Sequence, residues 1–456
     1  MKTPFILLSG IVIALAFGHP WACFHGDPQH SGRSIKVVGA HLTRAGVRGL
    51  GGEISGSPAI REDGRVLVGA RDVRLYCLEV DLSDTAWVAD LTSYGSNIYY
   101  SSPALADSGN AYITTNRKLV KVRGDGVVRW SWPPHNSLSI SHSPVIGSDG
   151  RIYFACYSDS LYAVDPEGTL ASARPLANSV NSAPAVGLDG NILVATTSGT
   201  GPWQLWSFHP DGSTYWSFDL AGSADFASPA VGPDSTIYVG ANRYLYAVRT
   251  DGSLKWRDSL LARIQSCPAI ANESTLYVVA GAGLYCVDAD SGIRRRKSIG
   301  GSNYCSPAVD AEGNIYVGTA SGTNSRLYCI RPDSTVRDSH VFSDDIWSSP
   351  AIGESGRIYV GCMNDSLYLF QGSGAAVAEQ GGCAGQSAVR LLPNPARDVV
   401  RIVPYGKYSV KVYDAGGALV ARVSEADRVD LGGMRCGVYV VQVAAPRCPA
   451  LKLVLR

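Results

Sequence analysis

Charged residues are scarce in this sequence. Asp, Glu, Lys and Arg make up 17% of the 456 residues, and the formal net charge is +1. An average soluble protein has about 25% charged residues. A chain this close to neutral lacks the basic surface that attracts nucleic acids or anionic membranes, so we expect neither as a partner.

Long hydrophobic runs are also missing. The most apolar stretch, from Phe5 to Phe17, has about 13 residues, whereas a membrane-spanning helix needs about 20. It follows Lys2 and ends at small residues of the kind that signal peptidase requires. We therefore expect a signal peptide over residues 1–18, cleaved after Gly18, and no membrane span in the mature chain. Acylation of Cys23 is a less favoured alternative, because the residues before it fit a lipobox poorly.

The sequence contains no Cys-Cys pair, no His-x-x-x-His spacing and no Gly-Lys-Ser phosphate loop. These absences leave no motif for a zinc site or a nucleotide phosphate. The sequence has eleven cysteines, an odd number. Several of them occupy equivalent positions in the repeats. Cys77, Cys286 and Cys329 each follow a Leu-Tyr pair where other repeats carry alanine. We therefore interpret them as small buried hydrophobes, and not as a disulfide framework.

The main feature that is present is an internal repeat. A proline, usually preceded by Ser and followed by Ala, recurs eight times at intervals of 39 to 45 residues: Pro58, Pro103, Pro144, Pro184, Pro229, Pro268, Pro307 and Pro350. An apolar residue stands nine positions after every one of them. Turns such as Asp149–Gly150 lie between the two markers, and Asp-Gly is a strong hairpin signal. A Leu-Tyr run and a second turn follow, so each repeat is expected to form four short strands.

Four short strands in about 42 residues are typical of one blade of a β-propeller. The expected fold is all-β, with an eight-bladed propeller over residues 19–372 and a seven-bladed ring as the alternative. The eighth repeat lacks a fourth strand. A spare segment from Leu42 to Val47 precedes the first repeat, and we expect it to complete the last blade. Tryptophans in the fourth strands are expected to pack between blades: Trp87, Trp130, Trp216 and Trp256.

The repeat resembles that of the pyrroloquinoline quinone (PQQ)-type propellers. The resemblance is carried by the Ser-Pro-Ala strand, the Asp-Gly turn and the trailing Trp, as in Asp251–Trp256, and it covers about residues 21–371. The segment from Phe24 to Ser34 also resembles the stretch that leads into such propellers. That family includes quinoprotein dehydrogenases and binding-only members such as the lipoprotein scaffold of the outer-membrane assembly machine. The resemblance therefore implies the fold more specifically than the function.

The last part of the chain has a different pattern. Residues 373–387 are rich in Gly, Ala, Ser and Gln, a composition typical of a flexible linker. Residues 388–456 contain short alternating strands, which predict a small Ig-like β-sandwich. The order of these motifs resembles the C-terminal sorting domain of the type IX secretion system, which implies export across the outer membrane. An ordinary carbohydrate-binding or spacer sandwich is the alternative.

The sequence shows no catalytic constellation. The quinoprotein dehydrogenases use an adjacent-cysteine disulfide and long covering segments, and both are missing from this sequence. We expect no cofactor and no metal. The first hypothesis is a non-catalytic binding or scaffold propeller. A PQQ-dependent dehydrogenase and a carbohydrate-active enzyme are the alternatives.

Aromatic residues near the inner strands are the candidate ligand residues. Tyr94, Tyr99 and Tyr100 precede the second repeat, Tyr304 and Trp347 precede the last two, and all five could line the central channel. Trp203, in a loop of the fourth repeat, could bind a ligand or pack between blades. We expect the mature protein to be a monomer that is secreted or held on the cell surface. Its expected partners are the secretion machinery and an unidentified protein or glycan.

Overall fold

The computed structural model describes residues 19–39, 41–133, 139–140, 142–157, 160–176, 178–197, 202–301 and 304–373, together with seven C-terminal strands. The expected signal peptide and, apart from its first residue Ser373, the expected linker lie outside the described residues. The chain divides into two compact units, residues 1–377 and 378–456. The division falls between the two domains that the sequence predicts.

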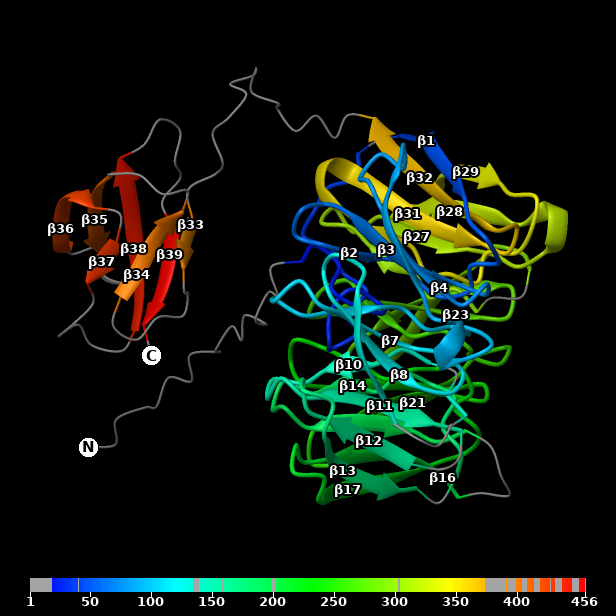
Figure 1. Ribbon diagram of the computed structural model, residues 1–456. Coiled ribbons are helices and arrows are strands. Elements are labelled where there is room, and N and C mark those ends of the chain that lie inside the picture. The colour runs from blue at the N-terminus through cyan, green and yellow to red at the C-terminus, as the bar shows by residue number, and fades with distance from the viewer. Residues whose placement is uncertain are drawn as a thin grey trace, which may run out of the picture. The chain divides into compact units, whose positions relative to one another are not determined.

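The first unit consists of eight four-stranded antiparallel sheets, which are the blades of a propeller (Figure 1). The eight-bladed prediction is confirmed, and the seven-bladed alternative is wrong. The first four blades contain β2 (Ala59–Ile60), β3 (Val66–Ala70), β4 (Arg74–Leu78) and β5 (Thr85–Asp90); β6 (Ala104–Leu105), β7 (Ala111–Thr114), β8 (Leu119–Val122) and β9 (Val128–Trp132); β10 (Val145–Ile146), β11 (Ile152–Cys156), β12 (Ser160–Val164) and β13 (Leu170–Pro175); β14 (Ala185–Val186), β15 (Ile192–Ala195), β16 (Trp203–Phe208) and β17 (Thr214–Leu220).

The next three blades repeat this order and the eighth has only three consecutive strands. They contain β18 (Ala230–Val231), β19 (Ile237–Ala241), β20 (Tyr244–Val248) and β21 (Leu254–Ser259); β22 (Ala269–Ile270), β23 (Thr275–Ala280), β24 (Gly283–Asp288) and β25 (Gly292–Ser298); β26 (Ala308–Val309), β27 (Ile315–Gly318), β28 (Arg326–Ile330) and β29 (Val336–Val341); β30 (Ala351–Ile352), β31 (Arg357–Cys362) and β32 (Ser366–Ser373). Three short 3-10 turns join strands: η1 (Thr92–Tyr94), η2 (Gly322–Asn324) and η3 (Glu354–Gly356).

The N-terminal strand β1 (His41–Gly49) completes the eighth blade, as the sequence predicts. It pairs antiparallel with β32, from His41 opposite Ser373 to Gly49 opposite Ser366, and the two run side by side in Figure 1. The two ends of the propeller domain therefore share one sheet. β1 covers the edge of β32 that would otherwise be unpaired.

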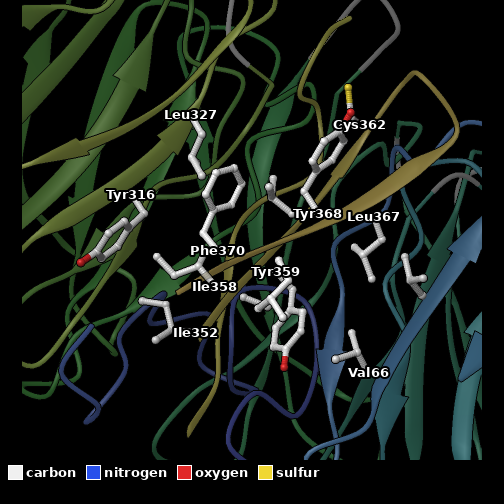
Figure 2. Close-up of a cluster of buried hydrophobic side chains, with 14 of the residues drawn as sticks. Val66, Tyr316, Leu327, Ile352, Ile358, Tyr359, Cys362, Leu367, Tyr368 and Phe370 are labelled. Atoms are coloured by element: carbon white, nitrogen blue, oxygen red, sulfur yellow. The ribbon is translucent and has the colours of Figure 1, made fainter. Parts of the chain in front are cut away.

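Apolar side chains from neighbouring blades pack together on both sides of this closure. Figure 2 shows Val66 of the first blade, Tyr316 and Leu327 of the seventh, and Tyr359 and Phe370 of the eighth. All five are at most 1% exposed and belong to one buried cluster. A blade alone has no partner for its apolar face, so the packing between blades supplies the core.

The predicted inter-blade tryptophans each contact the following blade. Their indole N–H groups donate to backbone carbonyls in that blade's turn between the third and fourth strands, over 2.6 to 3.0 Å: Trp87 to Gly124, Trp130 to Pro166, Trp216 to Thr250 and Trp256 to Ala289. A Cβ added to Gly126, in the turn facing Trp87, would lie 2.9 Å from that indole. The Gly of this turn thus provides both positive φ and room for the neighbouring ring.

Two blades without the tryptophan, the sixth and the seventh, make polar contacts with the following blade from their fourth strands. Arg295 of β25 donates to the carbonyl of Pro332 in the next blade. Asp338 of β29 accepts a hydrogen bond of 3.0 Å from the backbone N–H of Leu42 in β1. These contacts replace burial of an aromatic ring with hydrogen bonds that are partly exposed to water.

The second unit contains seven strands in two antiparallel sheets. β33 (Arg390–Leu392), β34 (Val399–Val403) and β37 (Arg428–Asp430) form one sheet. β35 (Tyr408–Tyr413), β36 (Leu419–Ala426), β38 (Gly437–Ala444) and β39 (Leu451–Leu455) form the other. Two sheets of short strands agree with the expected small β-sandwich.

Candidate functional site

The serines that precede the repeat prolines form a ring of hydrogen bonds that joins the inner strands. In six of the eight positions, the backbone N–H of one repeat donates to the Oγ of the next repeat's serine over 2.9 to 3.0 Å: Ser57 to Ser102, Ser102 to Ser143, Ala183 to Ser228, Cys267 to Ser306, Ser306 to Ser349 and Ser349 to Ser57. The two remaining steps lead to Ala183 and Cys267, which have no hydroxyl. The recurring serine therefore connects one blade to the next at six of the eight steps.

The N-terminal segment of residues 21–34, here called the N-terminal plug, covers one end of the channel. Its carbonyl groups accept hydrogen bonds of 2.7 to 2.9 Å from the second residue of six inner strands. The donor N–H groups and their acceptors are Ile60 to Trp21, Leu105 to Ala22, Val186 to Pro28, Val231 to Gln29, Ile270 to Ser31 and Val309 to Gly32. One segment thus contacts the inner strands of six different blades.

Two buried histidines fix the shape of the N-terminal plug. The Nδ1 of His25 lies 2.7 Å from the carbonyl oxygen of His30, and its Nε2 lies 2.7 Å from that of Pro307. His30 Nδ1 lies 3.1 Å from the carbonyl oxygen of Pro229. Burial lowers the pKa of His30 to about 3, with the nearby His25 as a smaller cause. The ring of His30 is therefore neutral at physiological pH.

Aromatic side chains close the other end of the channel. Four rings form a closed cycle in which each ring contacts the next. The centroid distances are 4.9 Å for Tyr100–Phe226, 5.3 Å for Phe226–Tyr304, 5.2 Å for Tyr304–Trp347 and 5.7 Å for Trp347–Tyr100. His142 contacts two of them, 5.7 Å from Tyr100 and 5.5 Å from Phe226. We call these five residues the aromatic plug. They precede the inner strands, whereas the N-terminal plug binds the strands' last residues, so the two plugs occupy opposite ends.

Charged residues border the aromatic plug. The guanidinium carbon of Arg71 lies 5.0 Å from the ring centre of Tyr99 and 6.0 Å from that of Trp347, and Arg71 also pairs with Glu53. Asp225 accepts a hydrogen bond of 2.6 Å from the amide of Asn181 and pairs with a neighbouring arginine. Tyr99 remains 37% exposed. This end therefore presents aromatic and charged groups together.

A small cavity separates the two plugs. Its volume is about 30 Å³, enough for one or two water molecules. It is lined by Phe24 of the N-terminal plug, by the whole aromatic plug, and by four serines: Ser55, Ser57, Ser306 and Ser349. The axial channel is thus filled largely by side chains.

Four of the six predicted channel and loop residues lie at this end of the axis: Tyr99, Tyr100, Tyr304 and Trp347. Tyr94 lies elsewhere, because η1 directs it onto the apolar cluster between the first two blades. Trp203 is the first residue of β16 and packs half-buried against the cluster between the fourth and fifth blades. The structure thus favours the packing alternative for Trp203.

The sequence interpretation missed His142 and Phe226, although a signal was available. Tyr100, Phe226, Tyr304 and Trp347 each stand three residues before a repeat proline. His142 stands two residues before one. An alignment of the repeats at proline places the first four at the same repeat position and His142 one position later.

The eight cysteines among the described residues are all buried, and none of them forms a disulfide. Burial raises the pKa of the Cys77 and Cys329 thiols to about 12. These thiols stay protonated at neutral pH and act as small apolar groups. The remaining three, Cys383, Cys436 and Cys448, fall outside the described residues or have undescribed side chains.

Solved structures with similar folds include a BamB protein and two dehydrogenases. BamB from Moraxella catarrhalis matches with a TM-score of 0.59 and 15% identity, over 74% of this chain and 99% of that chain. A quinohemoprotein alcohol dehydrogenase from Comamonas testosteroni has a TM-score of 0.62 and 12% identity, over 83% of each chain. A europium-containing methanol dehydrogenase has a TM-score of 0.61 and 11% identity, over 78% of this chain and 98% of that chain. These identities establish a shared fold only.

The described residues do not fit a quinone and its metal ion on the axis. Pockets that hold organic ligands usually measure about 300–1,000 Å³, roughly ten times the axial cavity of about 30 Å³. Tyr100 and Trp347, which line this cavity, stack on each other with ring centroids 5.7 Å apart. Within the described part of the chain, no group of three or more His, Cys, Asp or Glu side chains could hold a metal.

A search of curated proteins found no match. In the described part of the chain, no helix has the length and apolar character needed to span a membrane. The model of the family "Outer membrane protein assembly factor BamB" matches residues 122–337 and 206–378, together more than half of the chain. The model of the "Secretion system C-terminal sorting domain" matches residues 390–450. The chain therefore belongs to the BamB-type family of PQQ-like propellers and ends in a secretion sorting domain.

Proposed function

We propose that this protein is a secreted or cell-surface binding module without catalytic activity, exported through its C-terminal sorting domain. The propeller provides a rigid ring, and the end that carries the aromatic plug provides the binding surface. The observation that carries the proposal is the filled axis, which has about 30 Å³ of free space where a cofactor would lie.

Cofactor binding provides the test of the non-catalytic part. The purified mature protein is incubated with PQQ and Ca²⁺, desalted, and examined for quinone absorbance. We expect none, because the aromatic plug would have to separate to admit the cofactor. Quinone retained at one equivalent would support the dehydrogenase alternative and refute the proposal.

The binding surface is tested with a glycan array and a pull-down from outer-membrane extracts. Tyr99, which is 37% exposed beside Arg71, is replaced by alanine. Tyr215→Ala is the matched control, because Tyr215 is 48% exposed on the outer strand β17. We expect any specific ligand to be lost with Tyr99→Ala and kept with Tyr215→Ala. Equal binding by both variants would show that the binding site does not lie at this end of the propeller.

Export is tested by fractionation of cells that have the type IX machinery. The full chain should appear outside the cell or on its surface, whereas a chain that ends at residue 387 should stay in the periplasm. Equal export of both chains would refute the role of the last domain without affecting the binding proposal.

A further inference from the structure

The cavity between the two plugs is surrounded by hydrogen-bond donors that have no acceptor. Ser57, Ser306 and Ser349 line it, and the Oγ of each already accepts a backbone N–H. Each hydroxyl therefore has its own proton left to donate. Among the described residues, none of the three donates it to a protein acceptor.

One buried ring nitrogen adds to this set. Trp347 Nε1 is buried and has no hydrogen-bond partner among the described residues, and the Trp347 side chain lines the cavity. An indole N–H can only donate. Leaving such a group buried and unpaired costs about 1–3 kcal/mol, so this side chain favours a guest that accepts hydrogen bonds.

The residues that line the cavity favour an anion over a cation, because none of them is a carboxylate. Arg71 lies 6.0 Å from the ring of Trp347 and pairs with Glu53. Asp225, which borders the aromatic plug, binds Asn181 and pairs with Arg263 at 3.2 Å. A water molecule accepts only two hydrogen bonds, whereas a spherical anion of similar size accepts four or more.

We propose that the axial cavity is a buried binding site for one monatomic anion of the size of chloride. The anion would accept hydrogen bonds from the serine hydroxyls and from Trp347. It would join Trp347 of the aromatic plug to the serines of the inner strands through one central contact. The proposal is independent of the protein's external ligand.

Chloride itself is the probe in solution. The thermal unfolding midpoint of the mature full chain is measured in sodium gluconate and in sodium chloride at equal ionic strength. A ligand that binds only the folded state stabilises it by mass action, so we expect the midpoint to rise by at least about 2 °C in chloride. Equal midpoints in the two salts would overturn the proposal.

Matched tryptophan variants locate the effect. Trp347→Phe keeps an aromatic ring but removes the N–H, and it should abolish the chloride-dependent shift. Trp206→Phe is the control, because Trp206 also has a buried unpartnered Nε1 but packs between the third and fourth blades. A chloride shift retained in Trp347→Phe would contradict the assignment.

Crystals soaked in sodium bromide give a second readout that does not depend on folding of a variant. We expect an anomalous difference peak between the plugs, within hydrogen-bond distance of Trp347 and of at least two serines. Density that refines as water, with no anomalous signal, would refute the site.

Discussion

Trp21 provides the sharpest test of the claim that the N-terminal plug is part of the folded core. Its side chain is 0% exposed, its carbonyl accepts a hydrogen bond of 2.8 Å from Ile60, and it belongs to the cluster that spans the ring closure. Burial of a tryptophan removes about 150–250 Å² from water. At about 25 cal/mol per Å², this is worth about 4–6 kcal/mol, close to the 3–5 kcal/mol typically lost in Trp→Ala variants.

We therefore expect Trp21→Ala to lower the free energy of unfolding by about 4 kcal/mol. The assay is urea denaturation of the mature chain, followed by far-ultraviolet circular dichroism. Tyr215→Ala serves as the control, because an exposed side chain should change stability by less than about 0.5 kcal/mol. A loss below about 1 kcal/mol in Trp21→Ala would refute the reasoning, since it would mean that the segment detaches without cost.

Three further predictions concern the contacts between blades and the buried histidines. Trp216→Phe keeps the ring but removes its hydrogen bond to the next blade, so urea denaturation should show a loss of about 1 kcal/mol. Burial lowers the pKa of His142 to about 4 and that of His30 to about 3. Both histidines therefore bind a proton at a higher pH in the unfolded chain than in the folded one. As the pH is lowered from about 6.5 to about 4, the free energy of unfolding should decrease by up to about 1.4 kcal/mol per pH unit for each histidine. In His142→Gln, the free energy of unfolding should depend less on pH in this range. An unchanged pH dependence in this variant would contradict a neutral, buried His142 ring. Ala183→Ser supplies the acceptor that the serine ring lacks for the N–H of Ser143. It should raise the unfolding free energy by about 0.5–1.5 kcal/mol, and a lower midpoint in calorimetry would contradict the ring's role.

The blades and their closure could be predicted from the sequence because they depend on local signals repeated eight times. The proline positions, the Asp-Gly turns and the Leu-Tyr runs each identify a strand or turn within a few residues. The closing strand could be found by counting, since the eighth repeat lacked one strand and Leu42–Val47 was unassigned. The structure extends that strand to His41–Gly49.

The axial contacts were only partly predictable. Tyr99, Tyr100, Tyr304 and Trp347 were expected near the inner strands, but the sequence gives no distance between blades, so their stacking could not be foreseen. The N-terminal plug was noted only as a lead-in segment. Its hydrogen bonds join residues up to 282 positions apart, as between His25 and Pro307, and no local pattern encodes such contacts.

Hydrogen exchange tests the central claim most directly, namely that the N-terminal plug holds the ring closed by binding the inner strands of six blades. The probes are the amides of the six inner-strand residues whose N–H groups bind the plug: Ile60, Leu105, Val186, Val231, Ile270 and Val309. The account predicts that all six exchange only through global unfolding, with one common free energy, because opening any of them requires the whole segment to leave. Exchange of these amides at the rates of exposed loops, while the central strands of the blades stay protected, would contradict it.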